Sequence, residues 1–106
     1  MVKILLCCSA GMSTSMLVRK MENAASNKGL EAQIEAASME EFHDKLPEYD
    51  CCMLGPQIKY KLQDFQQNAS LLNKPIAVIN AMDYGMLNGE KVLQSALALI
   101  EASRGA

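Results

Sequence analysis

Two kinds of hydrophobic pattern alternate along the chain. Short runs that are almost wholly apolar are typical of strands buried on both faces of a parallel sheet. They predict four strands, at residues 2–7, 33–37, 49–54 and 75–79. The longer stretches between them carry apolar residues at every third or fourth position, which is typical of amphipathic helices. The chain is therefore expected to alternate strand and helix.

A helix is predicted after each of the four strands. The first should cover residues 13–28, because Lys28 and Gly29 supply a typical helix end. Ser38 and Glu41 have the spacing of a capping box, so a short helix should begin there and end near residue 47. Residues 80–89 are expected to form a turn-rich connection before the last helix. The inward faces of the last two helices are predicted to be Ile58, Leu62, Phe65 and Ala69, and Val92, Leu93, Ala96, Leu97 and Ile100.

Four strand–helix units in succession predict an α/β fold with one parallel sheet and helices on both of its faces. Crossovers between parallel strands are right-handed, which limits the topology, and we expect the strand order 2-1-3-4. In that order the winding reverses between the first and third strands, where ligands bind outside the carboxyl ends of the strands. The loops at this place are residues 9–12 and 55–57. We expect a single domain over residues 1–106 with its chemistry at these loops.

Composition narrows the class of protein. Half of the 106 residues are hydrophobic, which is enough for a compact core, and the net charge of −2 argues against a nucleic-acid-binding surface. No apolar run approaches the roughly 20 residues needed to span a bilayer. The apolar segment near the start is shorter than the roughly 7–15 residues of a secretory signal. We therefore expect a cytoplasmic protein.

The four cysteines form two adjacent pairs, Cys7-Cys8 and Cys51-Cys52. Disulfides are not expected, because no secretory signal indicates an oxidising compartment. The spacing is not that of a zinc site, and the single histidine, His43, is expected to be a solvated helix residue. Neither a metal nor another cofactor is therefore expected. A cysteine within an apolar strand is usually a small buried hydrophobe, which is our interpretation of Cys7, Cys51 and Cys52.

Cys8 differs from the other cysteines because it is followed by a loop of small residues and a helix start. A thiol at a helix N-terminus ionises more readily, and the thiolate is the nucleophilic form. Backbone N–H groups of such a loop can converge on a thiolate or on a phosphate. Cys8 is therefore the candidate catalytic nucleophile. The candidate phosphate-binding loop consists of Ser9, Ala10, Gly11, Met12, Ser13, Thr14 and Ser15.

The spacing of this loop is that of the cysteine phosphatases, in which five residues separate the cysteine from an arginine. Here that position is Thr14, and no aspartate is evidently placed as a general acid. The arginine would bind phosphate through two hydrogen bonds and stabilise charge in the transition state. A loop that can hold phosphocysteine without this group indicates a phosphoryl carrier rather than a hydrolase.

Four segments of the sequence resemble the enzyme IIB component of the lactose/cellobiose class of the bacterial phosphoenolpyruvate-dependent sugar phosphotransferase system. These segments are CSAGMSTS at 8–15, LGPQI at 54–58, NKP at 73–75 and YG at 84–85. The resemblance covers essentially the whole chain and is strongest to the cellobiose or oligo-β-glucoside branch. It implies a phosphotransferase with a phosphocysteine at Cys8 and a phosphate loop after the first strand of a four-stranded parallel sheet.

The resemblance also implies two partners. A cytoplasmic enzyme IIA would donate phosphate from a phosphohistidine, and a membrane-embedded enzyme IIC would present the acceptor, cellobiose or a related β-glucoside. Neither nucleic acid nor insertion of the chain into the membrane is implied. Three alternatives remain: a low-molecular-weight cysteine phosphatase or arsenate-reductase-like enzyme, a receiver-type module, and a detached sensory domain of IIB type. The missing arginine argues against the first, and the lack of an acidic cluster at the strand ends argues against the second.

Overall fold

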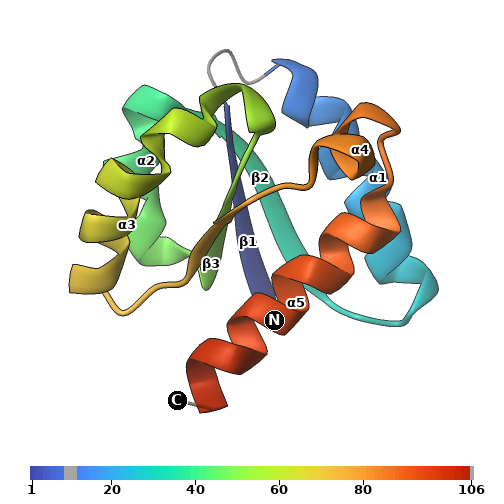
Figure 1. Cartoon of the computed structure of the whole chain (residues 1–106). Coiled ribbons are helices and arrows are strands. Elements are labelled where there is room, and N and C mark those ends of the chain that lie inside the picture. Colours follow the sequence, from blue (N-terminus) through green and yellow to red (C-terminus); the bar gives the residue numbers. More distant parts are fainter. Residues whose placement is uncertain (9–11, 106) are drawn as a thin grey trace.

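The computed structural model of the chain describes residues 1–8 and 12–105, without the side chains of residues 12, 13, 104 and 105. Within these residues, four strands form one parallel sheet in the order β2-β1-β3-β4 (Figure 1). The strands are β1 (Val2–Cys8), β2 (Ala32–Ser38), β3 (Cys51–Leu54) and β4 (Ile76–Val78). The predicted number, direction and order of the strands are confirmed.

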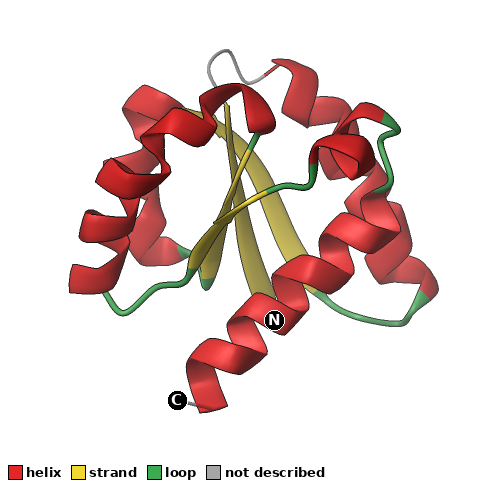
Figure 2. Ribbon diagram, in the orientation of Figure 1, coloured by secondary structure: helices red, strands yellow, loops and turns green. Residues whose placement is uncertain are grey.

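Helices cover both faces of this sheet (Figure 2). Among the described residues, no helix is both long enough and apolar enough to cross a membrane. One face carries α1 (Met12–Asn27) and α5 (Gly89–Gly105), and the other carries α2 (Phe42–Lys45) and α3 (Leu62–Leu71). The connections contain α4 (Ala81–Gly85) and the 3-10 turns η1 (Met39–Glu41), η2 (Leu46–Glu48) and η3 (Pro56–Lys61).

The sheet separates two hydrophobic cores. Side chains of β1 alternate between them, with Ile4 and Leu6 on the side of α1 and α5, and Leu5 and Cys7 on the side of α2 and α3. All four are fully buried, which is why this strand is apolar without alternation. The helices and turns that close the two cores contribute Leu17, Met21, Leu93 and Ala96 on the first side, and Phe42, Leu46, Phe65 and Ala69 on the second.

The connection between β2 and β3 differs in detail from the prediction. Ser38 and Glu41 do form a capping box, with the Ser38 N–H donating to Glu41 Oε1 at 3.1 Å, but it begins a 3-10 turn before α2. β3 begins at Cys51 rather than at residue 49, because η2 extends the connection. This turn ends with a hydrogen bond of 3.0 Å from the Tyr49 N–H to the Leu46 carbonyl.

The segment at residues 80–89 contains a helix, so its prediction as a turn-rich connection is wrong in part. The side-chain oxygen of Asn80 accepts from the N–H groups of Met82 and Asp83, at 2.9 and 3.1 Å. This N-cap satisfies two N–H groups that a helix start leaves unpaired, and α4 follows it directly. A helix of five residues is too short to show an apolar period, so the capping residue was its main signal in the sequence.

The first residue of α5, Gly89, is buried against α1. A Cβ at Gly89 would lie 2.4 Å from the carbonyl carbon of Lys20 and 2.6 Å from the nitrogen of Met21. No side chain fits in that space, so the N-terminal end of α5 rests directly on the backbone of α1. This contact orients α5 and, with it, the neighbouring α4.

Candidate functional site

The carboxyl ends of the strands lie at one edge of the sheet (Figure 1). β1 ends at Cys8, β3 is followed by Gly55, and β4 is followed by Ile79 and Asn80. β1 and β3 are neighbours, and the winding of the sheet reverses between them, as predicted. Cys8 therefore lies where sheets of this kind bind their ligands.

Thr14 is a buried polar partner of Cys8. The Sγ atom of Cys8 lies 3.4 Å from Oγ1 of Thr14, and the two residues are 1% and 0% exposed. The hydroxyl can accept a hydrogen bond from a thiol or donate one to a thiolate. A neutral hydroxyl therefore stands where the cysteine phosphatases have an arginine, and it is turned toward the sulfur.

The rest of the predicted phosphate-binding loop is placed only in part. Residues 9–11 lie outside the described residues, as do the side chains of Met12 and Ser13. The backbone of α1 begins at Met12, so its N–H groups and the positive end of its dipole lie close along the chain to Cys8. Ser15 is exposed on α1. The phosphate-binding role of this loop therefore stays a prediction.

A glycine and an amide side chain approach Cys8 from the neighbouring strand. The N–H of Gly55 donates to the carbonyl of Cys7 at 2.8 Å. A Cβ at Gly55 would lie 3.4 Å from Cβ of Cys8 and 2.5 Å from Oε1 of Gln57. On its other side, Gln57 donates from Nε2 to the hydroxyl of Tyr84 at 3.0 Å. The side chain of Gln57 thus extends from the end of β3 to α4.

The sequence places Gln57 in a loop at the winding reversal and Tyr84 in a segment that carries the family resemblance, but it does not predict the contact between them. Their signal was position, because each closely follows the carboxyl end of a strand in a sheet of known order. Their contact with each other depends on α4, which the hydrophobic pattern did not predict.

The other three cysteines are buried within the strands, as predicted. Burial raises the pKa of Cys7 to about 12, and its Sγ donates to the carbonyl of Ser38 at 3.3 Å. Burial also raises the pKa of Cys51 to about 12 and holds the pKa of Cys52 well above its ordinary value. These thiols stay protonated at neutral pH and are unsuited to act as nucleophiles.

We expect these three thiols to resist alkylation in the folded protein. In a Cys8→Ser variant at pH 8, iodoacetamide should leave them unmodified over a time that labels all three in denaturant, because thiolates are the reactive form. Rapid labelling of native Cys7, detected by mass spectrometry, would contradict this expectation.

The burial of these thiols should also make stability depend on pH. Since the folded pKa values of Cys7 and Cys51 exceed the unfolded value of 9.0, the free energy of unfolding should fall as the pH rises from about 9 towards 12.

His43 is exposed on α2, as predicted. Its ring meets the ring of Phe65 edge-on, with centroids 6.0 Å apart. Among the described residues, no three His, Cys, Asp or Glu side chains are grouped so that they could hold a metal ion.

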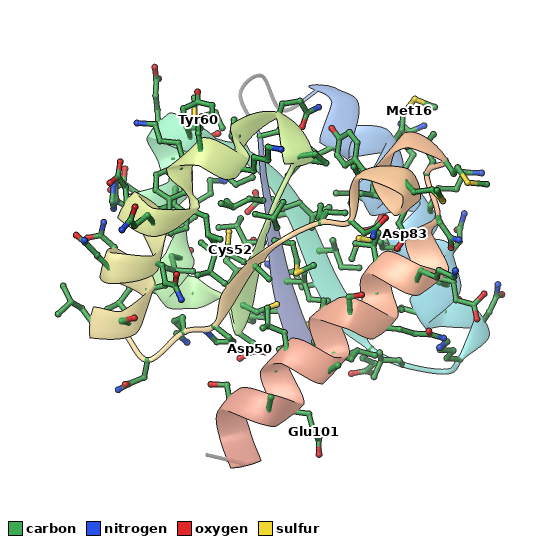
Figure 3. All side chains as sticks on the ribbon, viewed as in Figure 1. Met16, Asp50, Cys52, Tyr60, Asp83 and Glu101 are labelled. Atoms are coloured by element: carbon green, nitrogen blue, oxygen red, sulfur yellow. The ribbon has the colours of Figure 1, made fainter. Side chains whose placement is uncertain are left out.

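Large apolar side chains are exposed on the elements around the carboxyl edge of the sheet. We call Met16 on α1, Tyr60 on η3, and Met82 and Met86 on α4 the carboxyl-edge surface; they are 59%, 68%, 72% and 71% exposed. Figure 3 shows Met16 and Tyr60 at the same end of the molecule, on either side of the end of β1. Exposed apolar side chains on elements that flank a site can contribute to a surface that contacts another protein.

The fold and the site define a class of small α/β domains that present a cysteine at the winding reversal of a parallel sheet. Comparison with known proteins gives the family within this class. Residues 3–95 match the family described as "PTS system, Lactose/Cellobiose specific IIB subunit", where PTS is the phosphoenolpyruvate:carbohydrate phosphotransferase system. The chain belongs to this family, which confirms the resemblance found in the sequence.

Relatives of the chain are IIB components named for different sugars. It is 40% identical to the oligo-beta-mannoside-specific EIIB component of Bacillus subtilis, over 94% of this chain and 97% of that protein. It is also 40% identical to the cellobiose-specific component of Lactococcus lactis subsp. lactis and to the galactose-specific component of Lactococcus lactis subsp. cremoris. Each of these two matches covers 88% of this chain and 91% of the relative.

Solved structures of IIB components share the fold. The solution structure of the cellobiose-specific IIB component of Borrelia burgdorferi has a TM-score of 0.81 at 38% identity, covering 96% of this chain and 94% of that one. The lactose-specific IIB domain of Streptococcus pneumoniae has a TM-score of 0.84 at 21% identity, covering 92% and 96%, and supports the fold alone. IIB components of the PTS are phosphotransferases that work with IIA and IIC partners, taking phosphate from IIA and passing it to sugar. The chain is a phosphotransferase component of this kind.

Proposed function

We propose that the chain is a cytoplasmic phosphoryl carrier, acting as one IIB domain over residues 1–106, with its phosphate on Cys8. The donor is a phosphohistidine of an enzyme IIA of the lactose/cellobiose class. The acceptor is a sugar held by the membrane enzyme IIC. The observation that carries this proposal is the place of Cys8, which lies at the winding reversal with its Sγ 3.4 Å from the hydroxyl of Thr14.

The first transfer is an in-line attack of the Cys8 thiolate on the phosphorus of the phosphohistidine. The S–P bond forms, the N–P bond breaks, and the leaving imidazole nitrogen takes up a proton equivalent to the one lost by the thiol. In the second transfer the oxygen of a sugar hydroxyl attacks the same phosphorus: the O–P bond forms, the S–P bond breaks and Cys8 leaves as a thiolate, while the hydroxyl releases a proton equivalent to the one that restores the thiol. Phosphoryl transfer depends mainly on positioning and on stabilisation of charge. We assign these tasks to the N–H groups of residues 9–15 and to the hydroxyl of Thr14.

The lack of a cationic side chain in the loop suits a carrier. Residues 8–15 contain neither lysine nor arginine. An arginine would bind the phosphoryl group tightly and stabilise its transfer to water, as in a phosphatase. Neutral donors hold the group while leaving it available to a partner that supplies groups of its own. This arrangement favours the carrier over the low-molecular-weight phosphatase.

The carboxyl-edge surface is the proposed docking face for enzyme IIA. It consists of Met16, Tyr60, Met82 and Met86, which lie on α1, η3 and α4. Apolar side chains around the site can seal it from water when a partner docks, which protects the phosphoryl group from hydrolysis. Methionine adapts its shape to a partner surface at low cost, because its side chain is flexible and polarisable.

The proposed sugar is cellobiose or a related β-glucoside. Support comes from the lactose/cellobiose family match and from a relative named for cellobiose. Relatives named for galactose and oligo-β-mannoside are equally similar, so these sugars are the appropriate competitors in a transfer assay with membranes that contain enzyme IIC. Faster transfer to galactose than to cellobiose would refute the choice of sugar and leave the carrier role intact.

Mass mapping of the phosphorylated residue tests the proposed function. The chain is incubated with phosphorylated enzyme IIA of the lactose/cellobiose class and digested under neutral conditions. We expect one phosphate per chain, on the peptide and residue that correspond to Cys8. Phosphate on any other residue, or none at all, would refute the proposal.

Substitutions at Thr14 test whether its neutral hydroxyl helps to hold the phosphoryl group on Cys8. Thr14→Val keeps the shape of the side chain and removes the hydroxyl next to Sγ, so the transfer rate from enzyme IIA should fall about tenfold, the worth of one hydrogen bond to a charged group. Thr14→Ser restores the hydroxyl and should recover most of the rate. Stopped-flow or quench-flow measurement of phosphate uptake distinguishes the variants. Equal rates for valine and serine would show that the hydroxyl has no part in transfer.

A further inference from the structure

We infer that the side-chain amide of Gln57 binds the phosphoryl group on Cys8 and that the hydroxyl of Tyr84 holds this amide in place. The inference rests on the proposed function, in which Cys8 carries phosphate, and adds a residue from outside the loop after β1. Gln57 follows the carboxyl end of β3, and Tyr84 lies on α4, which follows the carboxyl end of β4. The hydrogen bond between them therefore lies at the same end of the sheet as Cys8, the last residue of β1.

Gly55 allows the amide of Gln57 to approach Cys8. Oε1 of Gln57 lies 2.5 Å from the position that a Cβ of Gly55 would occupy, and Cβ of Cys8 lies 3.4 Å from that same position. Gln57 and Cys8 therefore face each other across a residue that has no side chain. Gly55 is itself tied to β1 by the hydrogen bond of 2.8 Å from its N–H to the carbonyl of Cys7. A phosphoryl group on Cys8 comes within reach of the amide.

The amide can serve both states of the cysteine by turning about its last side-chain bond. With a free thiol, Oε1 of Gln57 faces Gly55 and Nε2 donates to the Tyr84 hydroxyl at 3.0 Å. A phosphoryl dianion repels a carbonyl oxygen and accepts hydrogen bonds from an NH2 group. A half-turn of the amide presents Nε2 to the phosphoryl group. The Tyr84 hydroxyl both donates and accepts, so it holds the amide in either orientation.

A neutral donor at this place suits the charge of the site. Residues 8–15 supply no cationic side chain to the phosphoryl group. A hydrogen bond to a charged group is worth more than one between neutral groups, and an amide supplies it without the lasting attraction of a fixed positive charge. The amide of Gln57 thus stabilises phosphate on Cys8 and still releases it to the acceptor.

Substitutions distinguish the role of the Gln57 amide from that of the Tyr84 hydroxyl, which holds the amide in place. Gln57→Leu keeps the size of the side chain and should slow phosphorylation of Cys8 by enzyme IIA about tenfold. Gln57→Glu places a negative charge against the phosphoryl group and should slow it about a hundredfold. Tyr84→Phe should slow it about threefold in the parent chain and have no further effect in Gln57→Leu, because it acts through the amide. Gln66→Leu, at an exposed glutamine of α3, is the matched control and should leave the rate unchanged.

Gln57 is exposed, so its loss would also slow transfer if its side chain contacted enzyme IIA. A second measurement is therefore made on the isolated chain, without enzyme IIA. The side-chain NH2 signals of Gln57 are recorded by NMR on the isolated chain before and after phosphorylation. We expect them to shift on phosphorylation, and the phosphorus signal of the phosphocysteine to move in Gln57→Leu and to stay in place in Gln66→Leu. Unmoved Gln57 signals in a chain that carries phosphate on Cys8 would overturn this inference and leave the proposed function intact. A chain whose Cys8 takes up no phosphate would overturn both.

Discussion

Replacing Cys8 with serine is expected to slow phosphorylation of the chain by enzyme IIA at least about a thousandfold. A serine hydroxyl has nearly the same reach but is scarcely ionised at neutral pH, so the attack on phosphorus loses its nucleophile. Cys7→Ser should transfer at nearly the parent rate. Cys7 packs on the side of the sheet that faces α2 and α3, and its Sγ donates to the carbonyl of Ser38. Burial raises the pKa of the Cys7 thiol to about 12.

The adjacent cysteine is thus the matched control for Cys8. Phosphate uptake is followed by mass spectrometry of the intact chain, and thermal unfolding confirms that both variants are folded. Because Cys7 is fully buried, Cys7→Ala provides a second variant in case serine disturbs the core. Loss of uptake in folded Cys7 variants, together with normal uptake in Cys8→Ser, would refute the assignment of the nucleophile.

Gly89→Ala is expected to lower the free energy of unfolding by about 3 kcal/mol. The added methyl group would lie 2.4 Å from the carbonyl carbon of Lys20 and 2.6 Å from the nitrogen of Met21, so backbone atoms must move to admit it. A flexible side chain could turn aside, whereas two packed helices must separate along their contact. Urea unfolding of the variant and the parent measures the loss. Displacing α5 also moves the neighbouring α4, so the hydrogen bond from Gln57 to Tyr84 should weaken in this variant.

Gly85→Ala is the control for this substitution. A Cβ at Gly85 meets nothing within 4 Å, and the residue lies in α4 without a positive φ. Alanine favours a helix over glycine, so the free energy of unfolding should stay constant or rise by up to about 1 kcal/mol. If Gly89→Ala were tolerated as well as Gly85→Ala, the close contact between α1 and α5 would not be what holds α5 in place.

The strand order and the position of Cys8 could be predicted because they depend on local patterns and on the handedness of crossovers. The apolar run at residues 4–7 fits burial on both faces, and the observed sheet buries it in that way. Once the order of the strands is known, the cysteine at the end of β1 must lie at the winding reversal. The burial of Cys7, Cys51 and Cys52 follows from the same runs.

The contacts of the site could not be predicted, because they join residues whose separation follows no period. Thr14 was predicted to belong to the loop after Cys8, but the direct contact of its hydroxyl with Sγ was not. Gln57 meets Tyr84 across 27 positions, and that contact requires a helix too short to show an apolar period. The glycine at position 89 is typical of a turn in the sequence, and its packing role depends on where α1 lies.

The sheet that separates the two cores also makes them two separate units of packing. No buried side chain belongs to both clusters of the described residues, so substitutions beneath α2 and α3 should combine additively with substitutions beneath α1 and α5. Substitutions around Phe42 and Phe65 should therefore leave the packing behind Thr14 unchanged.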